Sequence, residues 1–302
     1  QKRAYAKLWD LLGLDNFQKC DDELEIEWEK DKDDYKDIRF TFKSEESYYV
    51  PCRLLIPKGI KEPIKTVICI QGHSKGMHIS VGEPKYEGDK DSIAGGDRDF
   101  ALRAINEGYA AIAIEQRYMG ECGGDENGPS CGREATTALL IGRTAIGERV
   151  WDVMRLIDVI EKHFTYLDKD NIMCLGNSGG GTTTFYAACI DIRIKTAVPS
   201  CAVCTYKDSI GAMYHCACNY IPHIAEFFDM GDLAGLIAPR KLVVVNGKLD
   251  NIFPDGGVKE SFEIIQKMYN EANAANSCRL VTGDEGHRFY ADKAWTVIKE
   301  MK

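Results

Sequence analysis

The stretch Leu175-Gly176-Asn177-Ser178-Gly179-Gly180-Gly181 follows a short apolar run at 171–174 and precedes a segment, 182–188, that can begin a helix. A strand, a serine between glycines and a helix form the context of a nucleophile elbow, in which the serine hydroxyl projects from a sharp turn. Small residues at 176 and 180 would let strand and helix approach closely. The pattern alone also fits a glycine-rich connection with an incidental serine, so the rest of the chain has to decide.

Near-continuous apolar runs recur on both sides of this stretch, at 66–70, 109–114, 195–198 and 241–247, and a last strand is expected at 278–281. Such runs are typical of strands buried on both faces of a parallel sheet. Helical patterns separate them, at 97–105, from about 137 to 162, at 258–269 and at 292–302. Two alternating segments, 37–42 and 48–56, come first and predict an antiparallel hairpin. We therefore predict an α/β fold with a mostly parallel, doubly wound sheet of about eight strands.

No repeat, low-complexity tract or persuasive linker divides the chain, so we expect a single domain over 1–302. Within it, 1–36 would form an N-terminal helix followed by an acidic, mostly solvated loop in which a strand begins. Residues 204–236 interrupt the strand–helix alternation after the sixth strand and are rich in aromatic residues and methionine. They predict a helical insertion that acts as a lid or a substrate wall, with a plain helical pair packed on the core as the alternative.

The composition, 44% hydrophobic and 28% charged over 302 residues, is that of a globular protein with a large core. The net charge of −9 and the lack of a basic cluster argue against a nucleic acid or an anionic membrane surface as partner. No apolar run approaches the roughly 20 residues of a membrane span, and no signal peptide is visible. We expect a cytoplasmic protein, although a leader before Gln1 is an alternative. The oligomeric state cannot be read from the sequence.

Twelve cysteines are many for a chain of this length. Cys69, Cys174 and Cys189 fall in expected strands and a helix, where free thiols behave as small hydrophobes, and this favours a reducing compartment. A zinc site is an alternative for the four cysteines at and after the strand at 195–198, with His215 as a further possible ligand. The four are Cys201, Cys204, Cys216 and Cys218. The short spacing between the two pairs favours packing thiols, so we predict no metal and no cofactor.

A serine nucleophile needs a base within hydrogen-bond reach, and the base needs an orienting group. In open α/β sheets these groups lie just after the carboxyl ends of strands. His287 directly follows the last strand, and Asp250 follows the strand ending at 245, with Asp255 as the weaker choice. We therefore predict Ser178, Asp250 and His287 as the catalytic residues.

Acyl transfer also needs backbone N–H groups directed at the developing oxyanion. One would come from Gly179, the residue after the serine. The other would come from His73, in the loop Gln71-Gly72-His73-Ser74-Lys75-Gly76 that follows the strand at 66–70. A metal or surface pair of His73 with His78 is the alternative, and no third ligand lies nearby in the sequence.

With these motifs in order, the chain resembles the α/β-hydrolase superfamily across roughly residues 48 to 302. Within it, the chain resembles the acetyl-xylan-esterase-like and dienelactone-hydrolase-like branch. The resemblance rests on the segments Gln71-Gly72-His73, Gly176–Gly180, Ile237–Arg240 with Val245–Asp250, and Gly286–Tyr290. Where the carbohydrate-esterase group of this branch usually has glutamine after the nucleophile, this chain has Gly179. Its Gln71-Gly72-His73 and His287-Arg288 also replace that group's Arg-Gly-Gln and His-Glu.

The loop at 115–121 resembles the arginine-glycine loop near the active site of that branch, which implies substrate contacts from Arg117 and Tyr118. Pairing of Arg117 with a buried carboxylate is an equal alternative. His215, in the insertion, is a further candidate for a substrate contact or a structural role.

Together these features predict a serine carboxylester hydrolase that acts through an acyl-enzyme and needs no cofactor. The resemblance implies an acetylated carbohydrate or a similar short-acyl ester as substrate. A peptidase or amidase using the same residues, and a non-catalytic binding protein on a hydrolase scaffold, are the alternatives.

Overall fold

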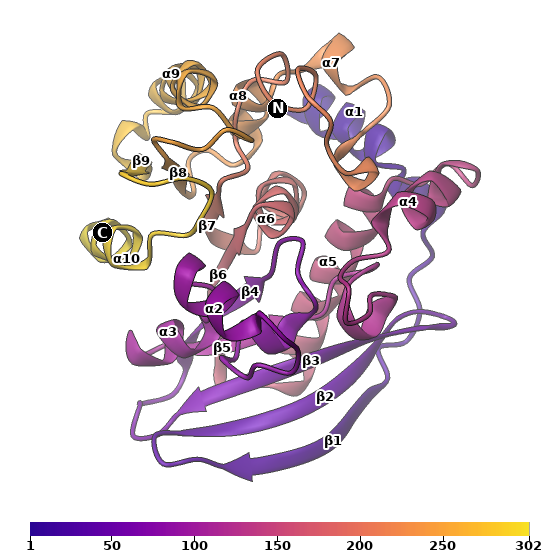
Figure 1. Cartoon of the computed structure of the whole chain (residues 1–302), viewed down its shortest axis with the longest axis vertical. Coiled ribbons are helices and arrows are strands. Elements are labelled where there is room, and N and C mark those ends of the chain that lie inside the picture. Colours follow the sequence, from indigo (N-terminus) through magenta and orange to yellow (C-terminus); the bar gives the residue numbers. More distant parts are fainter. Residues whose placement is uncertain (302) are drawn as a thin grey trace.

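The computed structural model describes residues 1–301, and within them nine strands form one sheet in the order β1-β2-β3-β5-β4-β6-β7-β8-β9. The strands are β1 Leu24–Asp31, β2 Tyr35–Glu45, β3 Tyr48–Pro57, β4 Ile64–Ile70, β5 Ala110–Ile114, β6 Leu167–Asn177, β7 Ile194–Ser200, β8 Lys241–Gly247 and β9 Cys278–Gly283. Strands β1, β2, β3 and β5 pair antiparallel, and the strands from β5 through β4 to β9 pair parallel. The predicted α/β fold with an N-terminal hairpin is confirmed (Figure 1).

Strand β1 occupies a segment that the sequence analysis assigned mostly to a loop. Only Leu24 and Trp28 of this strand are partly buried, and its other side chains, most of them charged, are exposed. Because an edge strand pairs on one side only, it can form with little hydrophobic patterning, and charged side chains discourage pairing with another chain. The expectation of a solvated loop was therefore wrong for these eight residues.

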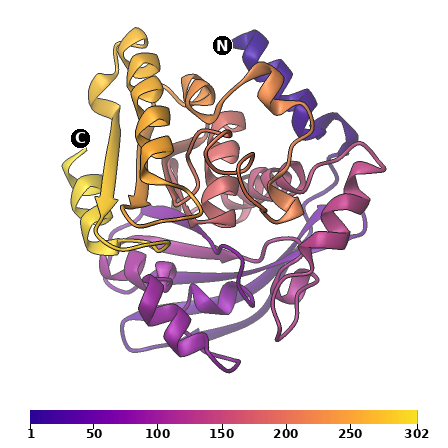
Figure 2. The same ribbon diagram turned by 45° about the horizontal axis from the view of Figure 1, so that its top comes forward.

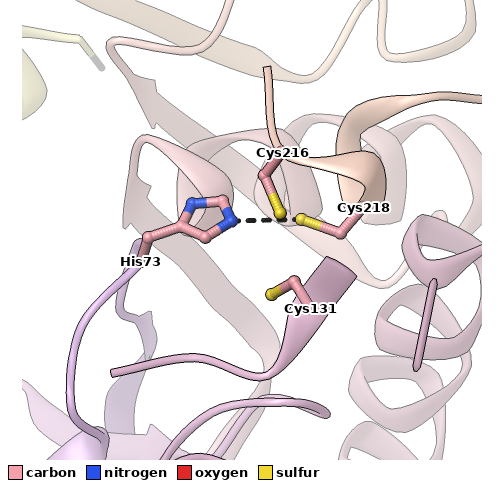
Figure 3. A group of neighbouring side chains, drawn as sticks. All are labelled: His73, Cys131, Cys216 and Cys218. Carbon is pink, nitrogen blue, oxygen red and sulfur yellow. Dashed lines mark hydrogen bonds between the residues drawn. The ribbon is translucent and has the colours of Figure 1, made fainter. Parts of the chain in front are cut away.

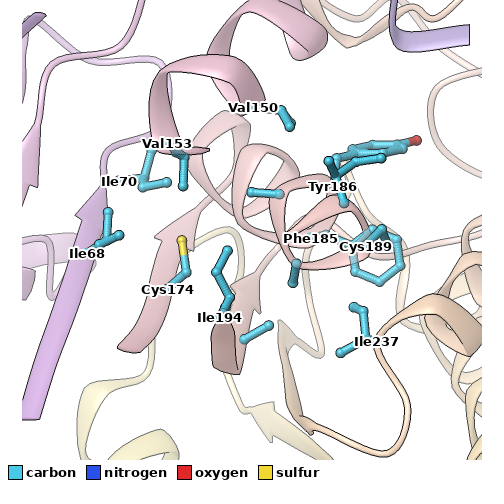
Figure 4. Close-up of a cluster of buried hydrophobic side chains, with 14 of the residues drawn as sticks. Ile68, Ile70, Val150, Val153, Cys174, Phe185, Tyr186, Cys189, Ile194 and Ile237 are labelled. Atoms are coloured by element: carbon cyan, nitrogen blue, oxygen red, sulfur yellow. The ribbon is translucent and has the colours of Figure 1, made fainter. Parts of the chain in front are cut away.

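Helices cover both faces of the sheet. Their bounds are α1 Lys2–Leu12, α2 Asp89–Gly96, α3 Phe100–Asn106, α4 Cys131–Leu139, α5 Ala145–His163, α6 Gly179–Ile190, α7 Ile224–Phe227, α8 Met230–Leu233, α9 Asp255–Glu271 and α10 Ala291–Glu300. Successive side chains of a strand point to opposite faces, so Ile68 of β4 packs with α5 and α6, whereas Val67 packs with α3 and α10. Figure 4 shows the core on the face covered by α5 and α6.

The helix expected from about residue 137 is two helices in the structure. Helix α4 ends at Leu139, and the chain then turns through Gly142, whose φ of +72° is accessible to glycine at little cost. Helix α5 starts anew behind Thr144, whose side chain accepts a hydrogen bond from the N–H of Gly147 at 2.9 Å. The break makes Cys131 the first residue of a separate short helix.

The expected insertion at 204–236 contains the short helices η4 (Ala217–Asn219), α7, α8 and η5 (Ala234–Leu236), joined by loops. Helix α7 lies beside α1, from the opposite end of the chain, as Figures 1 and 2 show. Their contact includes the Lys7 ammonium group, 4.7 Å from the centre of the Phe227 ring. Among the residues that the structure describes, no helix combines the length and apolar character that a bilayer crossing requires.

Candidate active site

Ser178 lies at the turn between β6 and α6, and its backbone is strained. Its φ of +55° and ψ of −124° lie outside the regions that residues with a side chain normally adopt. Two backbone hydrogen bonds maintain this turn: the Ser178 N–H donates to the Ser200 carbonyl at 2.8 Å, and the Thr182 N–H donates to the Ser178 carbonyl at 2.8 Å. Strain that the surrounding structure maintains is typical of functional sites.

Glycine is required where α6 meets the sheet. A Cβ atom at Gly180 would lie 2.1 Å from the carbonyl oxygen of Ile70, at the end of β4. From β4 the chain passes to β5 on one side, and from β5 it crosses over to β6 on the other side of β4, so the direction of winding reverses here. Ligands of open α/β sheets bind at such a switch point, at the carboxyl ends of the strands. Ser178 is therefore at the position where this architecture places binding sites.

Asp250 and His287 come from the loops after β8 and β9 and are joined by a hydrogen bond. The Nδ1 atom of His287 lies 2.8 Å from Oδ2 of Asp250, while the other carboxylate oxygen accepts from the N–H groups of Ile252 at 2.8 Å and Phe253 at 3.1 Å. Burial opposes the charge on Asp250, but His287 and these two N–H groups outweigh it and lower the pKa of the carboxyl. Asp250 therefore stays ionised, and it fixes the orientation of the imidazole ring.

Three contacts stabilise the loop that carries His287. Phe253 stacks on the His287 ring with centroids 6.0 Å apart and an interplanar angle of 18°. The next residue, Arg288, pairs with Asp97 at 2.8 Å, and the Tyr290 hydroxyl donates to the Gly286 carbonyl at 2.8 Å. Asp97 thus ends α2 and binds this loop, rather than starting the helix expected at 97–105.

Asp255, the weaker carboxylate candidate, does not contact His287 in the structure. It accepts a hydrogen bond from Asn246 Nδ2 at 3.0 Å and pairs with Lys259 at 2.6 Å, at the start of α9. Of the two carboxylates considered, the structure places Asp250 beside the histidine.

Ser178 and His287 line one cavity of about 400 Å³. The loop after β4 contributes Gly72 and His73, and the insertion contributes a wall that includes Met213, Tyr214, His215, Cys216 and Asn219. Sequence reasoning identified the insertion as a substrate wall or lid but singled out only His215 there for a substrate role. It also missed Arg98, which lines the cavity from the connection between α2 and α3.

The loop after β4 is pressed against the serine turn. A Cβ atom at Gly72 would lie 2.9 Å from the Cβ of Ser178 and 2.6 Å from the Asn177 carbonyl oxygen. Gln71 stabilises the loop, because its side-chain Nε2 donates hydrogen bonds to Ser80 Oγ and to the Arg98 carbonyl, each at 2.7 Å. Gly179 is the first residue of α6, where N–H groups have no acceptor within the helix. The two residues expected to supply oxyanion donors, His73 and Gly179, therefore flank the serine.

The family follows from a comparison of the whole sequence. Residues 16–280 match the profile of the Abhydrolase family. The chain is a member of the α/β-hydrolase family. The resemblance that the sequence motifs indicated is therefore confirmed.

Relatives of this α/β-hydrolase include the Bacillus subtilis (strain 168) protein named "Putative hydrolase YtaP", which is 25% identical over 244 residues, 78% of this chain and 77% of that protein. A putative acetyl xylan esterase from Bacteroides fragilis NCTC 9343 superposes with a TM-score of 0.79 at 17% identity, over 93% of this chain and 74% of the other. A glucuronoyl esterase from Solibacter usitatus gives a TM-score of 0.72 at 13% identity, over 97% and 90% of the two chains. At these identities, the structural similarities establish the shared fold.

Arg117 and Tyr118 lie outside the cavity lining, contrary to the expectation that they contact substrate. Arg117 is 5% exposed and pairs with Asp152 at 2.8 Å and with Glu45 at 2.7 Å. The Tyr118 ring faces the guanidinium of Arg149 at 5.6 Å. The alternative weighed from the sequence, a buried ion pair of Arg117, is what the structure contains, and this pair joins β2 to α5.

His215, the third candidate for substrate contact, does line the cavity. Its Nε2 lies 3.2 Å from Ser209 Oγ, and its ring packs edge-on against Phe253 with centroids 5.5 Å apart. Burial, together with the nearby imidazoles of His73 and His287, lowers the pKa of His215. A neutral ring in the same cavity as Ser178 and His287 can donate a hydrogen bond to a bound molecule or accept one from it.

The cysteines considered for zinc do not come together as one group. Cys201 lies with Asp250 and His287, whereas Cys216 and Cys218 lie with His73 and Cys131 (Figure 3). Hydrogen bonds from Cys131 and Cys216 lower the pKa of the Cys218 thiol well below its usual value. His78 pairs with Asp89 at 2.9 Å instead of joining His73.

Proposed function

We propose that this α/β-hydrolase is a serine carboxylester hydrolase with Ser178 as its nucleophile. The observation that carries the proposal is a strained serine that shares a cavity with a histidine hydrogen-bonded to a buried carboxylate. The three groups come from three loops at one edge of the sheet, in the chain order serine, aspartate, histidine that α/β-hydrolases use.

In the proposed reaction, His287 Nε2 removes the proton from Ser178 as its oxygen attacks the ester carbonyl. Asp250 accepts from His287 Nδ1, holds the correct tautomer and stabilises the imidazolium. The backbone N–H groups of Gly179 and His73 stabilise the oxyanion of the tetrahedral intermediate. His287 then protonates the leaving alcohol, and a water molecule that it activates releases the acid from the acyl-enzyme. This cycle requires no cofactor.

We propose a short-acyl ester of a carbohydrate as the substrate. The Tyr214 side chain is 95% exposed and lines the cavity, so it offers an apolar face on which a sugar ring can stack. The cavity, about 400 Å³ in volume, has room for a small acyl group beside Ser178. The structural relative described as a putative acetyl xylan esterase supports a short acyl group on a carbohydrate, and the one described as a glucuronoyl esterase supports a carbohydrate ester in general.

We further assign 1–302 to one catalytic domain, in which 204–236 serves as a substrate wall, because Met213 and Tyr214 line the cavity. A cytoplasmic location remains our proposal. Its support is the set of twelve free cysteines, nine of which are buried as thiols usually are in reduced proteins.

The test is hydrolysis of para-nitrophenyl acetate, of acetylated xylo-oligosaccharides and of para-nitroanilides by the wild type and by Ser178→Ala. We expect the variant to lose turnover while keeping its circular dichroism spectrum, and a fluorophosphonate probe to label only proteins with Ser178 intact. Ser47→Ala, at an exposed serine in the turn between β2 and β3, is the matched control and should behave as the wild type. Near-normal turnover by Ser178→Ala would refute the proposal. A wild type that neither turns over esters nor reacts with the probe would favour a binding protein, and cleavage of anilides alone an amidase.

A further inference from the structure

Four potential metal ligands meet beside the serine turn, although they come from three separate parts of the chain. His73 lies in the loop after β4, Cys131 begins α4, and Cys216 and Cys218 lie at the start of η4 in the insertion. One ring nitrogen of the histidine and the three sulfur atoms all lie within 4.8 Å of one another. Figure 3 shows the four side chains gathered from these separate segments. The His73 Nε2 atom is 3.1 Å from Cys218 Sγ.

We propose that these four side chains bind one zinc ion through His73 Nε2 and the sulfur atoms of Cys131, Cys216 and Cys218. Zn–S distances of about 2.3 Å and a Zn–N distance of about 2.0 Å in a tetrahedron place neighbouring ligand atoms roughly 3.5–3.8 Å apart. The observed spread is near this size, so small side-chain rotations complete the coordination. Three thiolates and an imidazole select zinc over magnesium or calcium, which prefer oxygen ligands.

The charge around the cluster matches a bound divalent ion. Three thiolates, a neutral imidazole and Zn²⁺ together carry one negative charge. Arg149 is 2% exposed, and its Nη2 lies 3.3 Å from Cys131 Sγ, where the guanidinium can balance that charge. A buried arginine costs free energy unless an anionic partner compensates it, and a zinc–thiolate group supplies such a partner.

The site is structural rather than catalytic. Four protein ligands close the coordination sphere, whereas a catalytic zinc keeps a position for water or substrate. Cys131 and Cys218 are 2% and 0% exposed, so the ion is shielded from solvent on that side. The ion would join the loop after β4, the start of α4 and the insertion, which have no strand pairing with one another.

On the proposed function, this zinc ion also positions the oxyanion loop. A Cβ atom at Gly179 would lie 3.1 Å from Cε1 and Nδ1 of His73, so the ring packs directly over the residue after the nucleophile. Coordination through Nε2 fixes the ring and, through it, the backbone N–H of His73. His73 is a positioning residue in this respect, and glycine at 179 is what leaves space for its ring.

The first test is elemental analysis of the full-length protein, purified without a polyhistidine tag and with zinc in the growth medium. We expect about one zinc per chain, as for other closed sites of this type. Cys131→Ser and Cys218→Ser should lose most of it. The matched control is Cys204→Ser, because the Cys204 thiol donates to the Pro254 carbonyl at 3.8 Å instead of joining the cluster; it should keep its zinc. Wild-type protein without metal would overturn the site, and one equivalent of another metal would overturn the assignment to zinc.

A second test does not depend on the folding of the variants. Cobalt exchanged into wild-type protein should give the intense absorption of tetrahedral cobalt–thiolate. Alkylation followed by mass spectrometry should show Cys131, Cys216 and Cys218 protected until a strong chelator is added. A disulfide between Cys216 and Cys218 in freshly purified protein, or alkylation of these thiols without chelator, would refute the proposal. Ser178→Ala should keep its zinc while losing turnover, so failure of the metal site and failure of the esterase assignment can be told apart.

Discussion

Replacement of Asp250 by asparagine separates the two functions of this carboxylate. In the wild type, Oδ1 accepts from the N–H groups of Ile252 and Phe253, and Oδ2 faces His287 Nδ1. Asparagine has one acceptor oxygen, and the two N–H groups hold that oxygen at the Oδ1 position. Its NH₂ group then faces His287 and donates to Nδ1, which forces the proton onto Nε2. In this tautomer the ring cannot accept the proton of Ser178.

We therefore expect Asp250→Asn to keep the fold and to lower kcat for para-nitrophenyl acetate by about 10⁴-fold, the size seen when the corresponding change inverts the tautomer in a serine protease, or about 5 kcal/mol of transition-state stabilisation. KM should change little, because the carboxylate does not touch substrate. The assay is steady-state hydrolysis, with nuclear magnetic resonance of the imidazole nitrogens to identify the tautomer.

Asp255→Asn is the matched control, since it changes the other carboxylate of the same loop, which binds Asn246 and Lys259. We expect activity within a few-fold of the wild type. A loss of less than tenfold in Asp250→Asn, or an equal loss in Asp255→Asn, would show that the role assigned to Asp250 is wrong.

Three further changes probe other parts of the site. Tyr214→Ala should raise KM for acetylated xylo-oligosaccharides by about tenfold, as expected for one lost aromatic contact, while leaving para-nitrophenyl acetate unaffected; an equal effect on both substrates would contradict sugar stacking. Gly179→Gln should displace the His73 ring and lower kcat by about 10- to 100-fold, whereas unchanged kinetics would show that the ring does not position the loop. Burial raises the pKa of Glu115 to about 8, above the usual 4.5, so its contribution to stability is complete below about pH 4.5 and disappears as the pH rises through about 8. Urea unfolding should show this decline in the wild type and a flatter profile in Glu115→Gln, and equal slopes would contradict a protonated Glu115.

The sequence was sufficient to predict the central sheet, because both-face burial gives β4, β5 and β8 nearly continuous apolar runs, at 67–70, 110–114 and 242–245. It was also sufficient to nominate Ser178, Asp250 and His287, since each follows a strand at the edge where ligands bind. Strand β1 was missed because an exposed edge needs no apolar pattern.

The contacts across loops could not be predicted in the same way. Whether Arg117 faces substrate or carboxylates depends on how β2 and α5 pack, and no local spacing carries that information. Cys131 and His73 are far along the chain from the Cys216-Ala217-Cys218 segment, and only folding brings them to it. Arg98 was assigned to the start of the helix expected at 97–105, whereas in the structure it lies in the connection between α2 and α3.

The residues that line the cavity come from two kinds of backbone, turns at strand ends and an insertion outside the sheet. Ser178, Asp250 and His287 lie on turns that follow strands, whereas Met213, Tyr214 and His215 belong to a short stretch outside the sheet. On the proposed function, Met213 and Tyr214 can therefore be exchanged to change which alcohol is recognised without moving the hydroxyl, imidazole and carboxylate assigned to ester cleavage. The fold in this way permits a change of substrate specificity with the same proposed catalytic residues. A library confined to positions 213 and 214 is the most direct way to look for new specificities.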